Sequence, residues 1–213
     1  MPVAVKICGI TSADAVEAAV AAGAQFGGLV FHPKSPRNVA LDQARVLADR
    51  MRGRLKIVAL IADMDDAGIE AVVAAVKPDF LQLHGSESAR RTAEIRARFN
   101  IAIIKALPVA EASDFDAVAD YESVVDMLMF DARPPRGADR AGGHGAAFDW
   151  SLLTNRTFSK PWFLAGGLTP DNVGRAAVLA EARMVDVSSG VESAPGVKDT
   201  TLISNFINAA KAS

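Results

Sequence analysis

Two side chains in this sequence have the chemistry and the position of an acid and a base. Cys8 is the only cysteine in the 213 residues and follows a short apolar run at 3–7, and Asp131 follows the apolar run at 127–130. A thiolate is a competent base near neutral pH, and a desolvated carboxyl group is a competent acid. Two alternatives stay open: a lone cysteine also occurs as a small buried hydrophobic residue, and an acidic residue after a strand also caps a loop.

Two further residues are candidates for substrate binding. Arg37 lies in a proline-containing loop after the apolar run at 26–31, and His84 follows the run at 80–83. A guanidinium group binds a carboxylate through two parallel hydrogen bonds. The alternatives are a solvated surface arginine and a histidine whose hydrogen bonds are satisfied by its neighbours. The three histidines have no metal-binding spacing and there is one cysteine, so we predict no metal site.

Two consecutive glycine-containing turns, at 165–168 and 186–190, have the composition of an anion site. Glycines allow the backbone to approach a ligand closely and to point N–H groups at it. Two ordinary tight turns are the alternative, and neither a Walker loop nor a dinucleotide fingerprint is present. We expect Asp186 to face away or to be structural, because its carboxylate would repel a phosphate. The residues predicted to bind phosphate are Gly166, Gly167, Ser188, Ser189 and Gly190.

The elements that must position these residues repeat one pattern: a short apolar run, a turn, and an Ala-rich amphipathic stretch. The apolar runs lack polar alternation, which is typical of parallel strands buried on both faces. The predicted strands are 3–7, 26–31, 56–61, 80–83, 101–106, 127–130, 162–165 and 184–187. The predicted helices are 12–22, 41–52, 65–76, 86–99, 113–121, a single turn at 149–153, one that begins at 169–171, and 199–212.

This alternation predicts an α/β protein, a (βα)8 or TIM barrel that forms a single domain over residues 1–213. A doubly wound sheet is the alternative, although it more usually has five or six strands. We expect Ser12 to cap the first helix, Gly23 to end it, and Thr169 and Pro170 to begin the seventh. The long loops 32–40 and 133–147 both follow strands and therefore belong to the active-site face.

Composition excludes several classes of partner. The net charge is −2 and half of the residues are apolar, so we predict no binding to nucleic acid or to an anionic membrane surface. We see no signal peptide and no run long enough to span a bilayer, and we expect a cytoplasmic protein. The expected ligand is a phosphorylated small molecule, and the expected state is a monomer or a homodimer.

Nine stretches together resemble phosphoribosylanthranilate isomerase, an enzyme family of tryptophan biosynthesis. They are KICGIT (6–11), GLVF (28–31), SPR (35–37), QLHG (82–85), FD (130–131), FDW (148–150), AGGL (165–168), DVSSGVE (186–192) and PGVKD (195–199). They span nearly the whole chain in the family's order.

The resemblance implies a reaction and a role for each residue. The family isomerises N-(5′-phosphoribosyl)anthranilate to a 1-deoxyribulose 5-phosphate derivative by an Amadori rearrangement, without a metal or an organic cofactor. Asp131 matches the general acid that protonates the furanose ring oxygen, and Cys8 matches the base that removes the proton from C2′. Arg37 matches the residue that binds the anthranilate carboxylate. The glycine turns match the phosphate site.

Some residues depart from the family's sequence pattern, and other functions stay open as alternatives. Residues 142–145 read Gly-Gly-His-Gly where the family usually has Gly-Gly-Thr/Ser-Gly, and Asp63 stands where an Asn is more familiar. We expect strand alternation to direct Lys6 away from Cys8, so that Lys6 does not lower the thiol pKa. The rivals are an indole-glycerol phosphate synthase with Lys105 as its acid, a sugar-phosphate epimerase, and a barrel that binds a phosphorylated ligand without catalysis.

Overall fold

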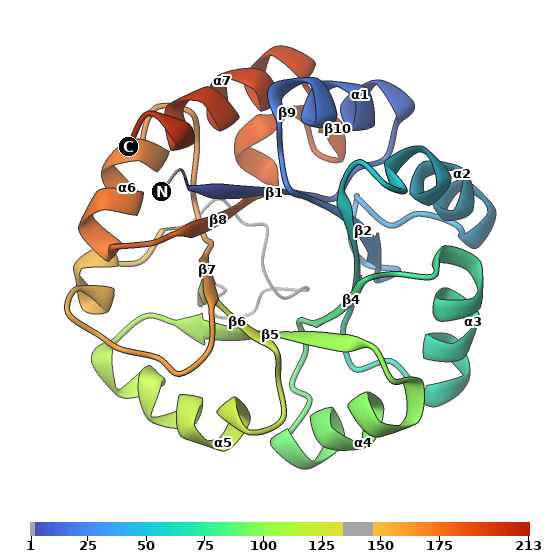
Figure 1. Ribbon diagram of the computed structural model, residues 1–213, viewed down its shortest axis with the longest axis horizontal. Helices are drawn as coiled ribbons and strands as arrows, with labels where there is room; N and C mark the ends of the chain where they lie inside the picture. Colours follow the sequence, from blue (N-terminus) through green and yellow to red (C-terminus); the bar gives the residue numbers. More distant parts are fainter. Residues whose placement is uncertain (1–2, 134–146) are drawn as a thin grey trace.

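The computed structural model describes residues 3–133 and 147–213, and its strands close into a parallel barrel (Figure 1). The strands follow one another around the barrel in sequence order, and β8 pairs with β1. They are β1 (Ala4–Cys8), β2 (Phe26–Phe31), β3 (Lys56–Ile61), β4 (Phe80–Leu83), β5 (Ala102–Val109), β6 (Met127–Ala132), β7 (Trp162–Leu164) and β8 (Met184–Val187). The predicted (βα)8 barrel is confirmed.

Helices form the outer ring of the molecule in Figure 1. The α-helices are α1 (Ala13–Ala22), α2 (Leu41–Met51), α3 (Asp66–Val76), α4 (Ala89–Phe99), α5 (Val118–Glu122), α6 (Val173–Ala180) and α7 (Thr200–Lys211). Short 3-10 helices are η1 (Ala112–Ala117), η2 (Trp150–Leu153) and η3 (Ser189–Val191). The Ser12 side chain accepts a hydrogen bond from the Ala15 N–H, and Gly23 ends α1 with a φ of 82°, so both predicted caps are confirmed.

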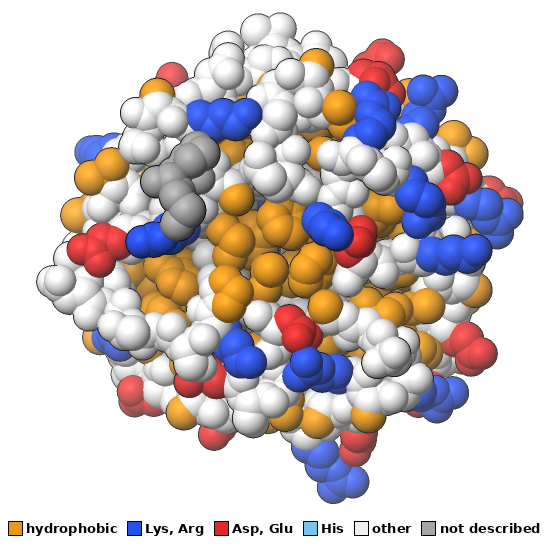
Figure 2. Space-filling view, in the orientation of Figure 1, with side chains coloured by type: hydrophobic (Ala, Val, Ile, Leu, Met, Phe, Trp, Pro, Cys, Tyr) orange, Lys and Arg blue, Asp and Glu red, His pale blue; other side chains and the backbone are white. Residues whose placement is uncertain are grey.

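The core has two layers because successive strand residues point to opposite faces. Outward-facing residues such as Val5 and Ile7 join the large cluster between barrel and helices. Inward-facing residues fill the barrel with a smaller cluster that includes Phe26, Met129 and Phe163. Apolar side chains gather over the barrel centre in Figure 2, with charged side chains beside this patch and around the periphery. The barrel is therefore a packed core.

The structure corrects several predicted elements. The helix after β7 begins at Val173 instead of Thr169, because the Asn172 side chain accepts from the Thr169 N–H and donates to the Gly167 carbonyl, which keeps the preceding residues in a turn. The segment 112–122 divides into η1 and the short α5. A small hairpin of β9 (Glu192–Ala194) and β10 (Val197–Lys198) was not predicted.

No helix within residues 3–133 and 147–213 is long and apolar enough to cross a membrane. The predicted Gly-Gly-His-Gly loop at 142–145 lies outside the described residues.

Candidate active site

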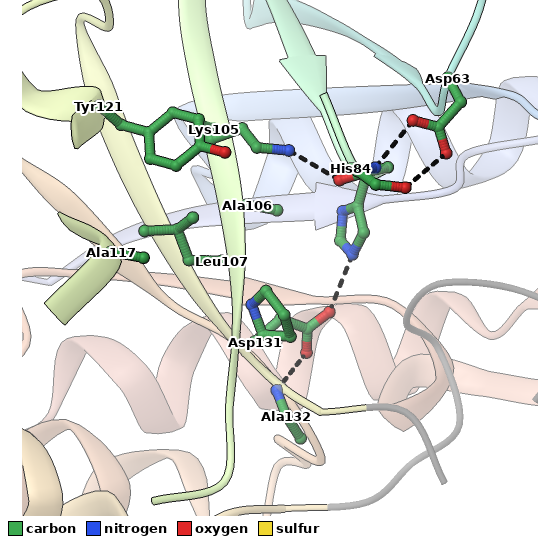
Figure 3. A pocket seen from close by; sticks show the side chains of 12 residues that line it. Asp63, His84, Lys105, Ala106, Leu107, Ala117, Tyr121, Asp131 and Ala132 are labelled. Carbon is green, nitrogen blue, oxygen red and sulfur yellow. Dashed lines mark hydrogen bonds and ion pairs between the residues drawn. The ribbon is translucent and has the colours of Figure 1, made fainter. Parts of the chain in front are cut away.

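The acid candidate, Asp131, lies at the end of β6 with only 9% of its surface exposed. Its Oδ1 accepts the Ala132 N–H at 2.8 Å, and its Oδ2 lies 3.1 Å from His84 Nε2 (Figure 3). The Gln82 amide nitrogen lies 2.8 Å from His84 Nδ1. With that amide donating to Nδ1, a neutral His84 carries its proton on Nε2 and directs it at Asp131. His84 therefore links the Gln82 amide to the candidate acid.

A cavity of about 490 Å³ opens beside this pair (Figure 3). Asp131 and His84 line one side, and Leu107 and Tyr121 contribute apolar surface. Asp63 also lines it, but its carboxylate accepts hydrogen bonds from the backbone N–H and hydroxyl of Ser86. Asp63 thereby joins the loops that follow β3 and β4.

Lys105, the acid required by the indole-glycerol phosphate synthase alternative, is occupied by other contacts. Only 2% of its surface is exposed, and its Nζ lies 2.8 Å from Glu87 Oε2 and 2.7 Å from the Gly85 carbonyl oxygen. Buried lysines paired in this way hold the backbone around them. The geometry therefore favours a structural role for Lys105.

The base candidate, Cys8, lies at the end of β1 and is 4% exposed. Burial raises the pKa of the Cys8 thiol, and this outweighs the lowering by the nearby Lys6 and Lys198 ammonium groups. The net pKa lies above the ordinary value of a thiol. The predicted orientation of Lys6 was wrong, because residues two apart on a strand share a face, and Lys6 lies inside the barrel with Cys8.

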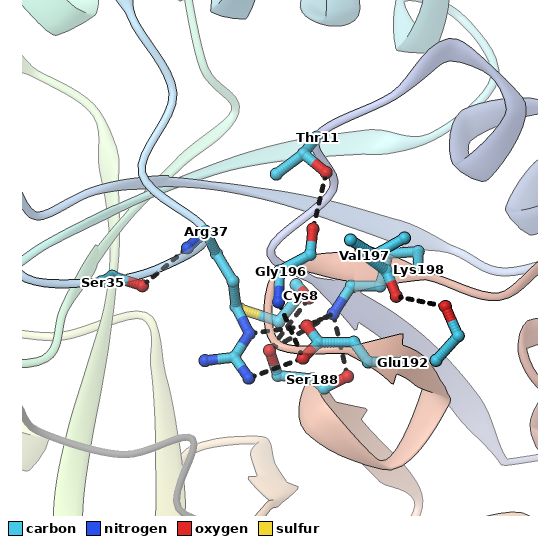
Figure 4. Close-up of polar contacts among 10 residues, drawn as sticks. Cys8, Thr11, Ser35, Arg37, Ser188, Glu192, Gly196, Val197 and Lys198 are labelled. Carbon is cyan, nitrogen blue, oxygen red and sulfur yellow. Dashed lines mark hydrogen bonds and ion pairs between the residues drawn. The ribbon is translucent and has the colours of Figure 1, made fainter.

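Arg37 lies over the β1 end, and its guanidinium is fixed by an acidic residue that the sequence analysis missed (Figure 4). Arg37 Nε and Nη2 donate to the two carboxylate oxygens of Glu192 at 2.7 and 2.8 Å. This pairing uses the Nε edge of the guanidinium and leaves the edge between Nη1 and Nη2 for another carboxylate. Gly9 is required below it, since a Cβ there would lie 2.5 Å from Arg37 Cδ.

Glu192 also binds Lys198, so the short hairpin connects three charged residues. Lys198 Nζ lies 2.7 Å from Glu192 Oε1, 2.8 Å from the Ser188 carbonyl and 3.4 Å from the Ser188 hydroxyl. The Ser188 hydroxyl in turn donates to the Cys8 carbonyl at 3.2 Å. The segment after β8 is therefore attached directly to the strand that carries Cys8.

The two glycine turns lie against each other and against the acid. A Cβ on Gly190 would lie 1.9 Å from the Leu168 carbonyl oxygen, so the turn after β8 contacts the turn after β7. A Cβ on Gly166 would lie 2.5 Å from the Ala132 nitrogen and 3.0 Å from Asp131 Oδ1. Gly166 and Gly167 have φ angles of 86° and 65°, which favour glycine. Ser189 lies within the second turn and begins η3, which leads into the hairpin.

Asp186 faces the barrel interior instead of the turns. Its Oδ1 lies 2.7 Å from Lys6 Nζ, and the two residues are register partners on β8 and β1. The expected structural role agrees with this pairing. Among the described residues, no group of three or more histidine, cysteine or acidic side chains is arranged to hold a metal.

Comparison with known proteins identifies the family. Residues 5–209 match the family described as N-(5'phosphoribosyl)anthranilate (PRA) isomerase. A protein of Rhodopseudomonas palustris (strain BisA53) named N-(5'-phosphoribosyl)anthranilate isomerase is 52% identical over 100% of this chain and 97% of its own length. Its namesake in Paramagnetospirillum magneticum (strain ATCC 700264 / AMB-1) is 50% identical over 99% of this chain and 98% of its own length.

Solved structures give the same result. The phosphoribosyl anthranilate isomerase of Thermotoga maritima superposes with a TM-score of 0.87 and 34% identity, covering 99% of this chain and 100% of that one. An isomerase structure in complex with reduced 1-(o-carboxyphenylamino)-1-deoxyribulose 5-phosphate has a TM-score of 0.83, 32% identity and the same coverage. The chain belongs to the N-(5'-phosphoribosyl)anthranilate isomerase family.

Proposed function

We propose that this chain isomerises N-(5′-phosphoribosyl)anthranilate to 1-(2-carboxyphenylamino)-1-deoxyribulose 5-phosphate, an aldose–ketose isomerisation in tryptophan biosynthesis. The full-length match to the family supports the reaction, and the relative solved with the reduced compound supports the ligand. The observation that carries the proposal is the order of groups around the barrel. The acid lies at the end of β6, the two glycine turns follow β7 and β8, the thiol lies at the end of β1, and the arginine follows β2. These five strands are consecutive neighbours in the barrel.

That order gives the phosphate and the carboxylate of the substrate separate sites at one end of the barrel. The phosphate binds at Gly166, Gly167, Ser188, Ser189 and Gly190, between the acid and the base. The anthranilate carboxylate binds the free edge of Arg37, beyond the base. The ribose carbons then lie between Asp131 and Cys8. His84 contacts Asp131 and adjoins the cavity, so we assign it to the substrate-binding surface and to the orientation of the acid.

The proposed chemistry is two proton transfers followed by a tautomerisation. Asp131 donates a proton to the furanose ring oxygen, the bond between that oxygen and C1′ breaks, and the nitrogen lone pair forms a protonated Schiff base at C1′. The Cys8 thiolate then removes the C2′ proton, and the electron pair forms the C1′–C2′ double bond of an enolamine. Loss of the 2′-hydroxyl proton and protonation of C1′ give the ketone. Each positioned acid or base contributes roughly 10²–10⁴-fold to the rate.

Several finer statements remain predictions. They are a single domain over residues 1–213, the absence of a cofactor, a cytoplasmic location, a monomeric or homodimeric state, and the absence of nucleic acid as a partner.

A turnover assay tests the proposal. The unstable substrate is generated in situ, and its fluorescence is followed after the purified chain is added. We expect the fluorescence to disappear at a rate proportional to enzyme concentration. Binding of phosphate to the chain without any loss of fluorescence would instead identify a barrel that binds a phosphorylated ligand without catalysis. That result would end the proposal.

A further inference from the structure

A buried lysine lies beside the candidate base. Lys6 has 0% of its surface exposed, and it precedes Cys8 by two residues on β1. A Cβ built on Gly28 would lie 3.2 Å from Lys6 Nζ and 3.3 Å from Cys8 Sγ, so those two atoms are at most 6.5 Å apart. The register pairs Cys8 with Gly28, whose missing side chain leaves room for both groups.

Charged groups surround Cys8 on three elements. Lys6 lies on β1, Asp186 on β8 and Lys198 on β10, while Glu192 and Arg37 lie beyond Lys198. Burial lowers the pKa of Lys6, but Asp186 and Cys8 outweigh burial, and the net pKa is above the ordinary value. Lys6 is therefore a cation throughout the neutral range.

Hydrogen-bond geometry distinguishes the two lysines. Lys198 has three oxygen acceptors for its three N–H bonds, two from Ser188 and one from Glu192. Within the described residues, Lys6 Nζ has one oxygen acceptor, Asp186 Oδ1 at 2.7 Å. A lysine ammonium carries three donors, so Lys6 keeps donors for the neighbouring sulfur.

We infer that Lys6 is the positioning residue that stabilises the Cys8 thiolate for C2′ proton abstraction, and that Asp186 holds Lys6 in place. This inference rests on the proposed function. An uncompensated buried thiolate would be strongly disfavoured by desolvation, and a buried cation within 6.5 Å offsets that cost. Asp186 neutralises Lys6 when the thiol is protonated, so the resting site contains no unpaired buried charge.

The solitary cysteine makes a direct test possible. Thiolate absorbance near 240 nm reports Cys8 alone once the trace of Cys8→Ala is subtracted. The titration is measured for the wild type, for Lys6→Met, and for a double variant that combines Lys6→Met with Asp186→Asn. The double variant removes both charges of the ion pair, so it keeps the test available if Lys6→Met alone does not fold. Lys105→Met is the matched control, because it also removes a buried lysine from an ion pair, on β5.

We expect both Lys6 variants to require a higher pH for thiolate formation. Coulomb's law at an effective dielectric constant of about 20, applied at the limiting separation of 6.5 Å, gives roughly 75-fold less thiolate at a given pH for Lys6→Met. We expect kcat to fall with the thiolate while KM changes little, and the Lys105→Met titration to overlay that of the wild type.

Superimposable titrations of the wild type and both Lys6 variants would overturn the inference, even in an active enzyme. A shift of equal size in Lys105→Met would also overturn it, since the effect would then come from a general loosening of the barrel. A shifted titration in a chain that shows no turnover would support the role of Lys6 in thiolate formation while contradicting the proposed function.

Discussion

We expect the replacement of Gly190 with alanine to push apart the two turns of the proposed phosphate site. An ideal Cβ at this position would lie 1.9 Å from the Leu168 carbonyl oxygen and 3.0 Å from the Leu168 carbonyl carbon. Both are backbone atoms, so neither rotates away as the end of a side chain does. The turns must move apart by about 1.1 Å for the oxygen contact to lengthen from 1.9 Å to 3.0 Å.

A displacement of this size removes a hydrogen bond. A backbone N–H that lies about 2.9 Å from a phosphate oxygen would lie about 4 Å from it after the shift, beyond bonding distance. A hydrogen bond to a charged group is worth about 1.5–3 kcal/mol. We therefore expect Gly190→Ala to weaken inhibition by inorganic phosphate by about 10- to 100-fold and to raise KM similarly.

Competitive inhibition by phosphate in the fluorescence assay measures the effect, with circular dichroism as the check on folding. Gly174→Ala is the matched control, because Gly174 lies in α6 and an added Cβ would approach nothing closer than 3.5 Å. We expect the control to bind phosphate like the wild type and to gain up to about 1 kcal/mol in stability from helix propensity. A folded Gly190→Ala enzyme with phosphate inhibition within about twofold of the wild type would refute the assignment.

Two other predictions concern the acid and the arginine. Asp131→Asn preserves shape but removes the proton donor, so turnover should fall roughly 10²–10⁴-fold with little change in binding of a reduced product analogue; retention of more than about a third of the wild-type kcat would remove Asp131 from the mechanism. Arg37→Ala should weaken anthranilate-bearing ligands about 10- to 100-fold and leave ribose 5-phosphate binding unchanged, as measured by calorimetry; equal losses for both ligands would contradict the carboxylate contact.

Much of the fold is readable in the sequence because one local pattern repeats. The buried runs that became β2, β3, β4 and β8 have their predicted bounds, since each is a short and mostly apolar segment. The ends of two further predicted strands, 127–130 and 3–7, then locate the candidate acid and base, because the carboxyl ends of parallel strands meet at one end of a barrel. The site is thus predictable where a local pattern determines it.

The parts that were missed depend on contacts between distant residues. Glu192 pairs with Arg37 across 155 residues, and no local pattern indicates that pairing. The β9–β10 hairpin is only three and two residues long, too short to show strand periodicity. Lys6 was misplaced for a different reason, because the two-residue repeat of a strand already puts it on the face of Cys8.

Stoichiometric alkylation of Cys8 tests the central claim most directly, namely that turnover depends on this thiol at the end of β1. Because Cys8 is the only cysteine, thiol-specific incorporation of one equivalent of iodoacetamide, counted by mass spectrometry, can occur only there. We expect activity to fall in proportion to label, and reduced 1-(o-carboxyphenylamino)-1-deoxyribulose 5-phosphate to slow the labelling. A fully labelled and fully active enzyme would contradict the proposed mechanism.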